Sequence, residues 1–513
     1  MNNTFRFTFF GLAFLLGACR EDIETPASPS SSKEFLSFGF LSENNPEYLT
    51  KDYFFSVNGS HINLMFPPGQ TVDSLIATFT SSTDSVMVDS IQQKSDTTIN
   101  NFSDSVVYTL VAEDSTIKTY QVKPRVFAGV PILYIDTEGQ APITSKDDYV
   151  DGELTLIANG SGEEPLTKVD MEIRGRGNTT WQMPKKPYRI KLDGKTEMLG
   201  MSADKSWVLL ANFSDKTLMR NHIAFEFSRR FGLAYTPRSR FVEVYLNGSY
   251  NGNYLLTEQI QIDEHRLNID ELDKNDIEED LISGGYLLEI DGRRDDDHWF
   301  RSGKNIPFTI KSPDKIADDQ LEYIKSYIQT AEDAIFSDSF TDPQQGYTKY
   351  IDVESFVNWY LVNEITKNND AAFGNSVFLH KPRDGKLFMG PVWDFDIAMG
   401  NINYSDAKNA EGWHIRKASW FSRLFEDPAF RQKIKARWNL FKDNEIKATL
   451  AEIDNTSAYL QESQTQNFKR WKILHKTVWP NPVVTGSYED EVKYMKDWLI
   501  KRIEWMDQAV NSL

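Results

Sequence analysis

Between residues 34 and 127, apolar positions come in short runs that alternate with polar ones, which is the pattern of half-buried β-strands. Turn-forming Gly, Pro, Asp and Ser separate these runs. The runs are HINLMFPPG at 61–69, SLIATFT at 74–80, DSVMVDS at 84–90, SVVYTLVAED at 105–114 and IKTYQVKP at 117–124. Short strands at this spacing predict a small all-β sandwich, and nothing in them has the character of a catalytic cluster. We expect this module to serve as a spacer or docking unit.

From residue 128 to about 400, strand patterns alternate with helical ones, beginning with VPILYIDTEG at 130–139 and GELTLIANG at 152–160. Residues 353–365 place apolar side chains at i, i+3, i+4, i+7, i+8 and i+12, which predicts an amphipathic helix with Asp352 as its N-cap. Beyond about residue 405 the pattern is mostly helical. The fold class expected is therefore multidomain, with an N-terminal all-β sandwich followed by an α+β domain that has a helical C-terminal part.

The N-terminal stretch MNNTFRFTFFGLAFLLGAC has a basic residue near its start, an apolar run and then small residues, which is the organisation of a signal peptide. The apolar run is shorter than the roughly 20 residues that a membrane-spanning helix needs. Its end, Leu16-Gly17-Ala18-Cys19, resembles the lipobox of bacterial lipoproteins, in which the cysteine is lipidated and becomes the first mature residue. The alternatives are an ordinary signal peptide or a short transmembrane anchor. Cys19 is also the single cysteine, so no disulfide can form within the mature chain.

Residues 19–33 follow as a segment rich in Pro, Ser and Thr, which we expect to be a tether because it has few side chains that could pack. Its CRED start resembles the surface-export signal of lipoproteins in the Bacteroides group. The organisation expected is a lipoprotein signal peptide at 1–18, the tether at 19–33, an Ig-like β-sandwich at 34–127 and a second domain at 128–513. A lipid on Cys19 would anchor the protein to the cell envelope at the outer membrane, facing either the periplasm or the outside.

Composition narrows the class of partner. The 513 residues are 40% hydrophobic and 13% aromatic, which indicates a globular chain that is too long for a single core. The formal net charge is -19 at pH 7. An acidic chain of this kind repels polyanions, so we expect no nucleic-acid partner.

One stretch departs from this acidity. RGRGNTTWQMPKKPYRIK, residues 174–191, contains basic side chains and no acidic one. The basic residues are Arg174, Arg176, Lys185, Lys186, Arg189 and Lys191. Gly175 and Gly177 allow the backbone to approach an anion closely and to present N–H groups to it. The stretch favours a phosphate site that ends in a strand with Arg189 and Lys191 on one face, and a solvated basic hairpin is the alternative.

The stretch PVWDFDIAMG, residues 391–400, places two carboxylates in an apolar environment. In an extended chain, Asp394 and Asp396 point to the same side while Phe395 points into the core. Two like charges that lose hydration together are tolerated when a cation lies between them. The alternative is a pair of aspartates that caps the following turn at the end of a strand.

The residues that precede Asp394 favour the interpretation that a cation lies between the two aspartates. The helix expected at 353–365 is followed by turn-forming residues that include Asp370, and Asn375 comes five residues later. A predicted hairpin at 376–393 then leads to Asp394. This order of an Asp, an Asn, a hairpin and an Asp-Phe pair is the layout of the protein-kinase catalytic loop and its metal-binding loop. In that chemistry the first Asp accepts the proton of the acceptor hydroxyl, while the Asn and the later Asp hold Mg²⁺ at the phosphates.

With these motifs in place, the sequence resembles the CotH kinases, which are secreted protein kinases of the spore-coat type with an atypical kinase fold. The resemblance spans roughly residues 130–400, with the helical remainder included, and it rests on several co-linear motifs. They are RGRGNTTWQMPKKPYRIKL, LMRNHIAFEFSRRFGL, VYLNGSYNGNYLLTEQI, NEITKNNDAAFGN and VWDFDIAMG. The family implies ATP, a divalent metal (Mg²⁺ or Mn²⁺) and an atypical protein-kinase-like fold for residues 128–513.

The resemblance also implies roles for single residues. Asp370 matches the catalytic base, and the metal ligands implied are Asn375, Asp394 and Asp396, the last standing where ordinary kinases have Gly. Lys186 or Lys191 would hold phosphates, and Glu226 would pair with that lysine. Arg176 and Gly177 of the basic stretch, with Glu258 from an apolar strand, complete the expected nucleotide site. The usual His-Arg before the catalytic Asp and the usual GxGxxG are missing, so ordinary kinase rules are not extended further.

Other acidic positions and other functions stay open at this stage. Glu289 and Asp291 lie in an apolar strand that suits a cleft role and a strand-end role equally, and residues 291–299 are typical of a solvated charged loop. The histidines lack the spacing of metal ligands, which argues against zinc. The function expected is an extracytoplasmic kinase for Ser or Thr of secreted or cell-envelope proteins. The alternatives are an inactive kinase-like adhesin or scaffold, and a glycoside hydrolase that uses Asp370 with Asp394.

Overall fold

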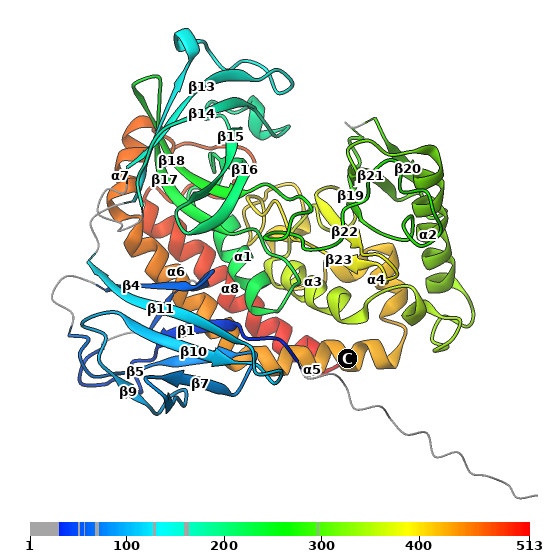
Figure 1. The fold of residues 1–513 in the computed structure, drawn as a ribbon, viewed down its shortest axis with the longest axis horizontal. Coiled ribbons are helices and arrows are strands. Elements are labelled where there is room, and N and C mark those ends of the chain that lie inside the picture. Colours follow the sequence, from blue (N-terminus) through cyan, green and yellow to red (C-terminus); the bar gives the residue numbers. More distant parts are fainter. Residues whose placement is uncertain are drawn as a thin grey trace, which may run out of the picture.

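The computed structural model describes residues 30–49, 52–55, 57–66, 71–126, 130–157, 164–294 and 297–513. The predicted signal peptide, the predicted lipidation site Cys19 and most of the predicted tether lie outside the described residues, as does the expected boundary between 127 and 128. Along the chain, β-strands dominate first, a mixed α/β region follows, and helices form the C-terminal part (Figure 1). The fold class expected from the sequence is confirmed at this coarse level.

The first region consists of strands and turns in the residues described between 30 and 126. The strands are β1 (Phe35–Phe40), β2 (Tyr53–Phe55), β3 (Val57–Asn58), β4 (His61–Phe66), β5 (Leu75–Ile76), β6 (Thr78–Ser81), β7 (Ser85–Val88), β8 (Ile91–Gln92), β9 (Ile99–Asn100), β10 (Val106–Val111) and β11 (Ile117–Val126). They pair into sheets with the orders β2-β1-β6, β3-β4-β11-β10-β7-β8 and β5-β9. Each of the five predicted runs overlaps at least one of these strands. Their core is largely aromatic, with Phe38, Tyr108 and Tyr120 fully buried.

A closed barrel follows, with the strand order β12-β13-β14-β15-β16-β18-β17. Its strands are β12 (Ile132–Thr137), β13 (Val150–Ile157), β14 (Leu166–Gly175), β15 (Tyr188–Met198), β16 (Met201–Leu210), β17 (Ser239–Leu246) and β18 (Ser249–Glu258). Helix α1 (Arg220–Arg230) lies between β16 and β17 in the sequence. The predicted basic stretch joins β14 to β15, so the barrel presents it as a loop followed by a strand.

A second sheet has the order β20-β21-β19-β22-β23. Its strands are β19 (Tyr286–Ile290), β20 (Trp299–Arg301), β21 (Pro307–Ser312), β22 (Val377–Lys381) and β23 (Phe388–Met389), with helix α2 (Asp318–Phe336) between β21 and the next helix. Strands β22 and β23 pair in antiparallel fashion, which confirms the predicted hairpin. Figure 1 shows this sheet and α2 on the opposite side of the molecule from the barrel strands β13–β16.

Helix α3 (Val353–Thr366) confirms the predicted helix and its cap, because the Asp352 side chain accepts a hydrogen bond from the backbone N of Ser355 at 2.7 Å. The amphipathic character expected for it is wrong. Residues 356–366 are buried without interruption, since α1, α5, α8 and strand β23 all pack around this helix. Helix α3 is therefore a central support of the fold, and it ends at Lys367 in a left-handed conformation, with φ of 49°.

The C-terminal part is helical, as the sequence predicts. Its longer elements are α4 (Ser419–Leu424), α5 (Pro428–Phe441), a π-helical segment (Lys442–Ile446), α6 (Lys447–Tyr459), α7 (Gln461–Arg470) and α8 (Tyr488–Asn511). Helix α8 buries Met495, Trp498, Leu499 and Met506 on one face, together with Arg502, which pairs with Glu364 of α3 at 2.6 Å. None of the helices in the described ranges combines the length and the apolarity that crossing a bilayer requires.

The N-terminal strands pack against helices α1 and α6 and against the π-helical segment that precedes α6. Arg229 of α1 donates to the backbone O of Leu36 at 2.8 Å, and Asn455 of α6 donates to the backbone O of Phe54 at 3.0 Å. The hydroxyl of Thr80 donates to Glu445 Oε1 at 2.9 Å. Figure 1 shows these strands lying along α6. The N-terminal module is therefore docked onto the rest of the protein along α1 and α6.

Candidate active site

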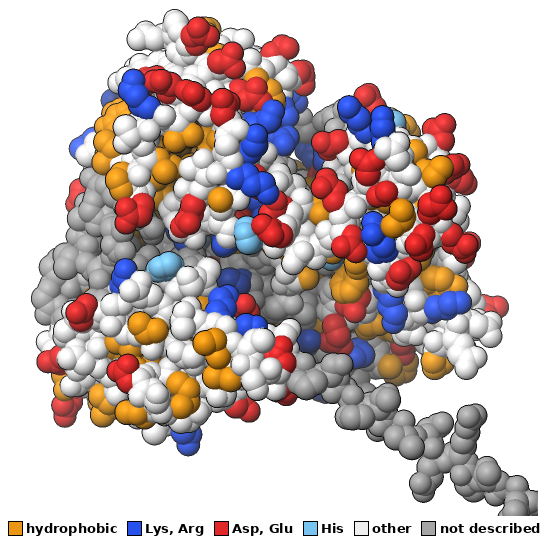
Figure 2. Space-filling model, in the orientation of Figure 1, with side chains coloured by type: hydrophobic (Ala, Val, Ile, Leu, Met, Phe, Trp, Pro, Cys, Tyr) orange, Lys and Arg blue, Asp and Glu red, His pale blue; other side chains and the backbone are white. Residues whose placement is uncertain are grey.

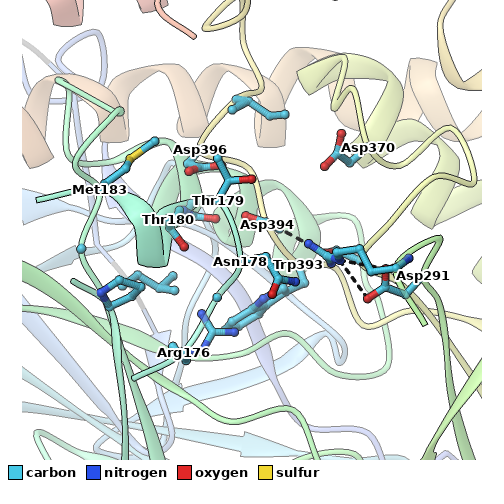
Figure 3. A pocket seen from close by; sticks show the side chains of 18 of the residues that line it. Arg176, Asn178, Thr179, Thr180, Met183, Asp291, Asp370, Trp393, Asp394 and Asp396 are labelled. Atoms are coloured by element: carbon cyan, nitrogen blue, oxygen red, sulfur yellow. Dashed lines mark hydrogen bonds and ion pairs between the residues drawn. The ribbon is translucent and has the colours of Figure 1, made fainter. Parts of the chain in front are cut away.

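A pocket of about 430 Å³ opens between the barrel and the second sheet. Its wall is built from the β14–β15 loop, the ends of β16 and β19, the turn after α3 and the loop after β23. Figure 2 shows Lys and Arg side chains gathered along the hollow between these two parts of the molecule. Figure 3 shows Asp370, Asp394 and Asp396 at this pocket together with Asn178, Thr179 and Thr180. The pocket thus unites the predicted basic stretch with the predicted carboxylates.

The turn after α3 carries Asp370. The backbone O of Asp370 accepts hydrogen bonds from the N of Gly374 at 3.0 Å and the N of Asn375 at 3.1 Å, so the chain folds back directly after the aspartate. Asn369 Nδ2 donates to Asp370 Oδ1 at 3.1 Å. Burial, followed by the negative charge of Asp394, raises the pKa of Asp370, while Asn369, Arg293 and Asn375 act in the opposite direction. A carboxyl with a raised pKa is a stronger proton acceptor once it is ionised.

The loop after β23 carries Asp394 and Asp396, and it is not the extended strand expected from the sequence. Strand β23 ends at Met389, and Asp394 has φ of 64°, so the two aspartates do not follow the alternation of a strand. Side chains hold the loop in place of a β-ladder: Asn221 Oδ1 accepts from the N of Phe395 at 2.8 Å, and Asn368 Nδ2 donates to the O of Asp394 at 3.1 Å. Phe395 is fully buried, which confirms the expectation that it points into the core.

The two aspartates of this loop repel each other in a poorly hydrated place. Burial raises the pKa of Asp396 well above its ordinary range, and the negative charges of Asp394, Asp215 and Asp370 add to this. Two hydroxyls stand near the pair: Ser214 Oγ lies 3.5 Å from Asp396 Oδ2, and Ser376 Oγ lies 3.4 Å from Asp394 Oδ2. These long contacts compensate little of the repulsion, so the site favours a proton or a cation between the carboxylates.

The side chain of Asn375, the third predicted metal ligand, contacts Gly292 and Asp370. Its Oδ1 accepts from the backbone N of Gly292 at 3.1 Å, and its side chain also hydrogen-bonds to Asp370. Asn375 is not part of the pocket wall. In the described part of the chain, no group of three or more His, Cys, Asp or Glu side chains is arranged to hold a metal ion by itself. The predicted ligand set is therefore divided between Asp394 with Asp396 and an asparagine that supports Asp370.

The barrel side of the pocket is basic. Arg174 and Arg189 lie directly opposite each other on β14 and β15, and both line the pocket. Arg176 lines it too, with its guanidinium 5.4 Å from the ring centre of Trp393. Burial lowers the pKa of Arg176 to about 10, although Asp394 acts in the opposite direction. Like charges that face each other across a strand pair destabilise a sheet, so an anion bound between Arg174 and Arg189 would relieve this repulsion.

Gly177 belongs to this wall because its backbone has φ of 76°, and a β-carbon there would collide with the side chain of Thr180. The loop can therefore turn tightly at this position only with a glycine. Arg176 and Gly177 are the two predicted nucleotide-site residues that the structure brings to the pocket.

The other four residues of the expected nucleotide site lie elsewhere. Lys186 donates to the backbone O of Trp181. The exposed Lys191 pairs with Glu172 at 2.7 Å, two positions along the strand pair from Arg189. Glu226 and Glu258 have arginine partners in place of a lysine. These partners are Arg229 and Arg230 for Glu226, and Arg238 for Glu258. The structure thus does not bring Lys186, Lys191, Glu226 or Glu258 to the pocket wall, because each is engaged in a local contact.

Six charged residues of the pocket were not assigned to it from the sequence. They are Lys146, Asp147, Glu289, Asp291, Arg293 and Lys311. Arg293 Nε donates to Asp291 Oδ1 at 2.9 Å, and although burial opposes it, the contact with Asp291 and the charge of Asp394 raise the pKa of Arg293. Lys311 Nζ lies 3.6 Å from Glu289 Oε2. The expectation of a solvated loop from 291 is therefore wrong for Asp291, which is buried, whereas Arg293 is exposed as expected although it lines the pocket. The signal in the sequence for this part of the site was an acidic residue at the end of the apolar strand that became β19.

Comparison with known proteins gives one family match. The family model described as "CotH kinase protein" matches residues 173–506. No curated protein matches the chain. Among solved structures, one that matches is the crystal structure of a "putative glycoside hydrolase" from Bacteroides thetaiotaomicron, with 17% identity over 36% of this chain and 53% of that chain and a TM-score of 0.18. This chain thus spans about half the length of that solved chain, and a likeness this weak carries no argument about fold or function.

Proposed function

The chain belongs to the CotH kinase protein family, and from that premise we propose that it is a protein kinase that transfers the γ-phosphoryl group of ATP to Ser or Thr of secreted or cell-envelope proteins. One observation carries the proposal: a single pocket places Asp370, Asp394 and Asp396 opposite a group of arginines. Phosphoryl transfer needs this combination, because catalysis consists of positioning the phosphates, neutralising their charge and accepting one proton.

Unpaired buried donors support the binding of phosphates. Arg174 and Arg189 each have a buried Nε without a hydrogen-bond partner. A buried donor that stays unpaired costs about 1–3 kcal/mol, and a ligand that supplies an acceptor would remove this cost. Phosphate oxygens match the fork of donors on a guanidinium group. In this proposal Arg174, Arg176 and Arg189 hold the phosphates of ATP, and Lys311 adds positive charge at the same pocket.

Asp394 and Asp396 are the residues that would hold a divalent cation, Mg²⁺ or Mn²⁺. Their carboxyls fit such an ion because oxygen donors suit hard cations, and because the charge of Asp394 already opposes ionisation of Asp396. Asn375 could join them if its Oδ1 left the backbone N of Gly292. A divalent cation bound there would supply positive charge to the phosphate oxygens. Two carboxylates alone leave room in the coordination shell for those oxygens, as expected for a cation that binds with ATP.

Asp370 is the proposed catalytic base. The hydroxyl oxygen of the acceptor forms a bond to the γ-phosphorus while the bond from that phosphorus to the β–γ bridging oxygen breaks. The hydroxyl proton passes to the Asp370 carboxylate, and ADP leaves with the bonding electron pair. Arg293 stands close enough to Asp370 to act on its charge, and it restrains the rise in the pKa of Asp370, so that the carboxyl can be ionised before the reaction.

The place of action is proposed from residues 1–19, which precede the described part of the chain. A signal peptide that ends in a lipidated Cys19 would deliver the protein to the outer membrane, and the acceptor would then be a protein of the envelope or one outside the cell. Labelling with a radioactive fatty acid tests the anchor, because Cys19→Ala should abolish incorporation.

A transfer assay tests the function. The chain without its signal peptide is incubated with γ-labelled ATP and Mg²⁺ or Mn²⁺, alone and with dephosphorylated casein as a generic acceptor. Phosphoprotein that requires the cation and disappears in Asp370→Asn supports the proposal. Cation-dependent ATP binding without any transfer would favour the inactive scaffold. Absence of ATP binding would contradict the proposal and leave the basic stretch as a solvated hairpin.

A further inference from the structure

Tyr404 and Trp479 form an exposed pair of stacked rings. The ring centres are 5.6 Å apart, and the ring planes are inclined by only 3°. About half of each residue faces solvent, 53% for Tyr404 and 50% for Trp479. Large aromatic surface that stays in water forgoes the free energy of burial, and exposed apolar patches of this kind mark surfaces that another molecule covers. We call this pair the aromatic platform.

The aromatic platform belongs to the wall of the candidate active site. Tyr404 and Trp479 line the same pocket as the three aspartates described above. They come from separate segments, because Tyr404 follows the carboxylate loop and Trp479 lies between α7 and α8. Val483 and Val484, which follow Trp479 closely in the sequence, are also exposed, at 36% and 44%. A molecule that reaches Asp370 past this part of the wall would therefore meet the two rings.

Two buried asparagines fix the aromatic platform to the carboxylate loop. Asn481 Nδ2 donates to the backbone O of Ser214 at 2.6 Å and to Asn401 Oδ1 at 2.8 Å. Asn401 Nδ2 in turn donates to the backbone O of Asp396 at 2.7 Å. The segment that carries Trp479 is thus tied to the segment that carries Asp396. A binding surface held in place before binding loses little conformational entropy when a ligand arrives.

The charges around Tyr404 indicate which end of the pocket the aromatic platform borders. The pKa of Tyr404 is raised by burial and then by the negative charges of Asp370, Asp396 and Asp394, in that order of size. The arginines proposed for the phosphates come from the barrel side. The platform therefore borders the part of the pocket wall that carries the carboxylates, where the acceptor hydroxyl has to reach Asp370.

We propose that the aromatic platform docks an aromatic or large apolar side chain of the protein substrate, close in sequence to the serine or threonine that receives the phosphate. The inference rests on the proposed function, since it names the substrate class of that site. A ring stacked on Trp479 or Tyr404 gains affinity beyond its buried area by about two- to tenfold.

A peptide scan tests the inference on the chain without its signal peptide. The probes are fluorescein-labelled peptides with one central serine in a Gly-Ala background and a single phenylalanine moved through the flanking positions. Fluorescence anisotropy, in the presence of Mg²⁺ and a non-hydrolysable ATP analogue, measures binding without turnover, and label from ATP measures transfer. The variants are Trp479→Ala and Tyr404→Ala. Tyr245→Ala is the matched control, because Tyr134 and Tyr245 form another stacked pair, 5.0 Å apart, that is not part of the pocket wall.

We expect phenylalanine at one or two positions to tighten binding by the parent about two- to tenfold, and we expect this gain to vanish in both platform variants and persist in Tyr245→Ala. Mg²⁺-ATP affinity should not change in the platform variants. If the parent transfers phosphate without any preference for phenylalanine, the inference is wrong while the kinase stands. If Trp479→Ala weakens Mg²⁺-ATP binding in the absence of peptide, the platform seats the nucleotide base and the inference is wrong. Phenylalanine-dependent binding without transfer would retain the docking platform and contradict the kinase.

Discussion

The three aspartates of the site differ in what surrounds them. Asp370 has an amide donor in Asn369 and a cationic neighbour in Arg293, whereas Asp396 is surrounded by other carboxylates. A base needs the first environment, because it must be able to lose its proton before the reaction and take one up during it. The second environment suits a cation ligand, because a bound cation removes the repulsion between the carboxylates. The two environments therefore predict different consequences of mutation.

Replacing the base should separate binding from chemistry. We expect Asp370→Asn to leave cation-dependent ATP binding nearly intact and to lower the transfer rate by roughly 10²–10⁴-fold, the range for a lost general base. Asp394→Ala should weaken ATP binding and abolish transfer, because the cation then loses one of its two carboxylates. Titration calorimetry with Mg²⁺-ATP, beside a transfer assay, measures both quantities. Unchanged binding in Asp394→Ala would return the aspartate pair to turn capping.

Two basic residues on one strand allow a matched comparison. Arg189 faces the pocket from β15 with an unpaired buried Nε, whereas Lys191 on the same strand is exposed and pairs with Glu172. We expect Arg189→Met to weaken ATP binding by about tenfold or more, because a hydrogen bond to a charged group contributes about 1.5–3 kcal/mol. Lys191→Met should change ATP affinity less than twofold, since exposed ion pairs contribute little. Equal effects in the two variants would mean that the strand acts only through its net charge.

The residues of the site that were foreseeable share one property: the sequence places them in a recognisable spacing. Asp370 and Asp394 flank a helix end and a hairpin, and Gly177 sits in a glycine-rich turn. Arg293 and Lys311 have no such spacing, because β19, β21 and the turn after α3 meet only when the second sheet forms. The choice of Lys191 as a phosphate ligand failed for the same reason. The alternation of side chains along a strand predicts which face of the sheet a residue lies on. The position of the pocket along that face depends on the rest of the barrel.

At the scale of elements, local sequence patterns predicted most strands and helices correctly, but they did not predict which side chains pack around each element. The apolar runs of residues 34–127 became strands, because period-two alternation is a property of the local chain. Burial of α3 on all sides could not be foreseen, since its polar residues find partners on distant elements, as Glu364 does with Arg502. The loop at 391–396 was expected to be a strand because it is apolar. Asn221 and Asn368, from other parts of the chain, satisfy its backbone instead.

The junction between the barrel and α7 should respond to pH through Lys185. This buried lysine donates to Asn467 Oδ1 at 3.0 Å and to the backbone O of Asn253, and burial lowers its pKa to about 7. A neutral amine keeps two N–H donors, enough for both contacts. The unfolded chain, with an ordinary lysine pKa, binds the extra proton between about pH 7 and pH 10. Stability from this site therefore increases as the pH rises through that window and is lowest below it.

Denaturant unfolding between about pH 6.5 and pH 9.5 measures this dependence. The free energy of unfolding of the parent, relative to Lys185→Met, should rise by at most about 1.4 kcal/mol per pH unit above pH 7. Lys191→Met is the control, because the hydrogen bond to Glu172 raises the pKa of Lys191 and the residue stays charged throughout the range. A difference between the parent and Lys185→Met that is independent of pH would mean that Lys185 remains protonated in the folded protein.

At the scale of the whole molecule, helix α1 joins the N-terminal module to the active site. Near one end, Asn221 holds the backbone N of Phe395 beside the carboxylate pair. At the other end, Arg229 donates to the backbone O of Leu36, and the guanidinium of Arg230 lies 5.7 Å from the ring centre of Phe54. This contact could not be foreseen, because the two partners lie far apart in the chain. The module therefore covers buried charge on the helix that helps to position the site.

Removing the N-terminal module should lower the stability of the remainder, because this cover is lost. In a chain that begins at residue 130, Arg229 and Asn455 lose their backbone acceptors, and Glu445 loses the hydroxyl of Thr80. Each such loss costs about 1 kcal/mol, and a domain of this size shifts its Tm by roughly 2–4 °C per kcal/mol. We expect the truncated protein to unfold several degrees below the parent in a thermal scan. Asn455→Ala in the full chain should give a smaller shift in the same direction, whereas the effect of Asn439→Ala, which removes a donor to the backbone O of Lys435 within α5, should not depend on whether the module is present. An unchanged Tm after truncation would mean that the module touches α1 and α6 without stabilising them and acts only as a spacer.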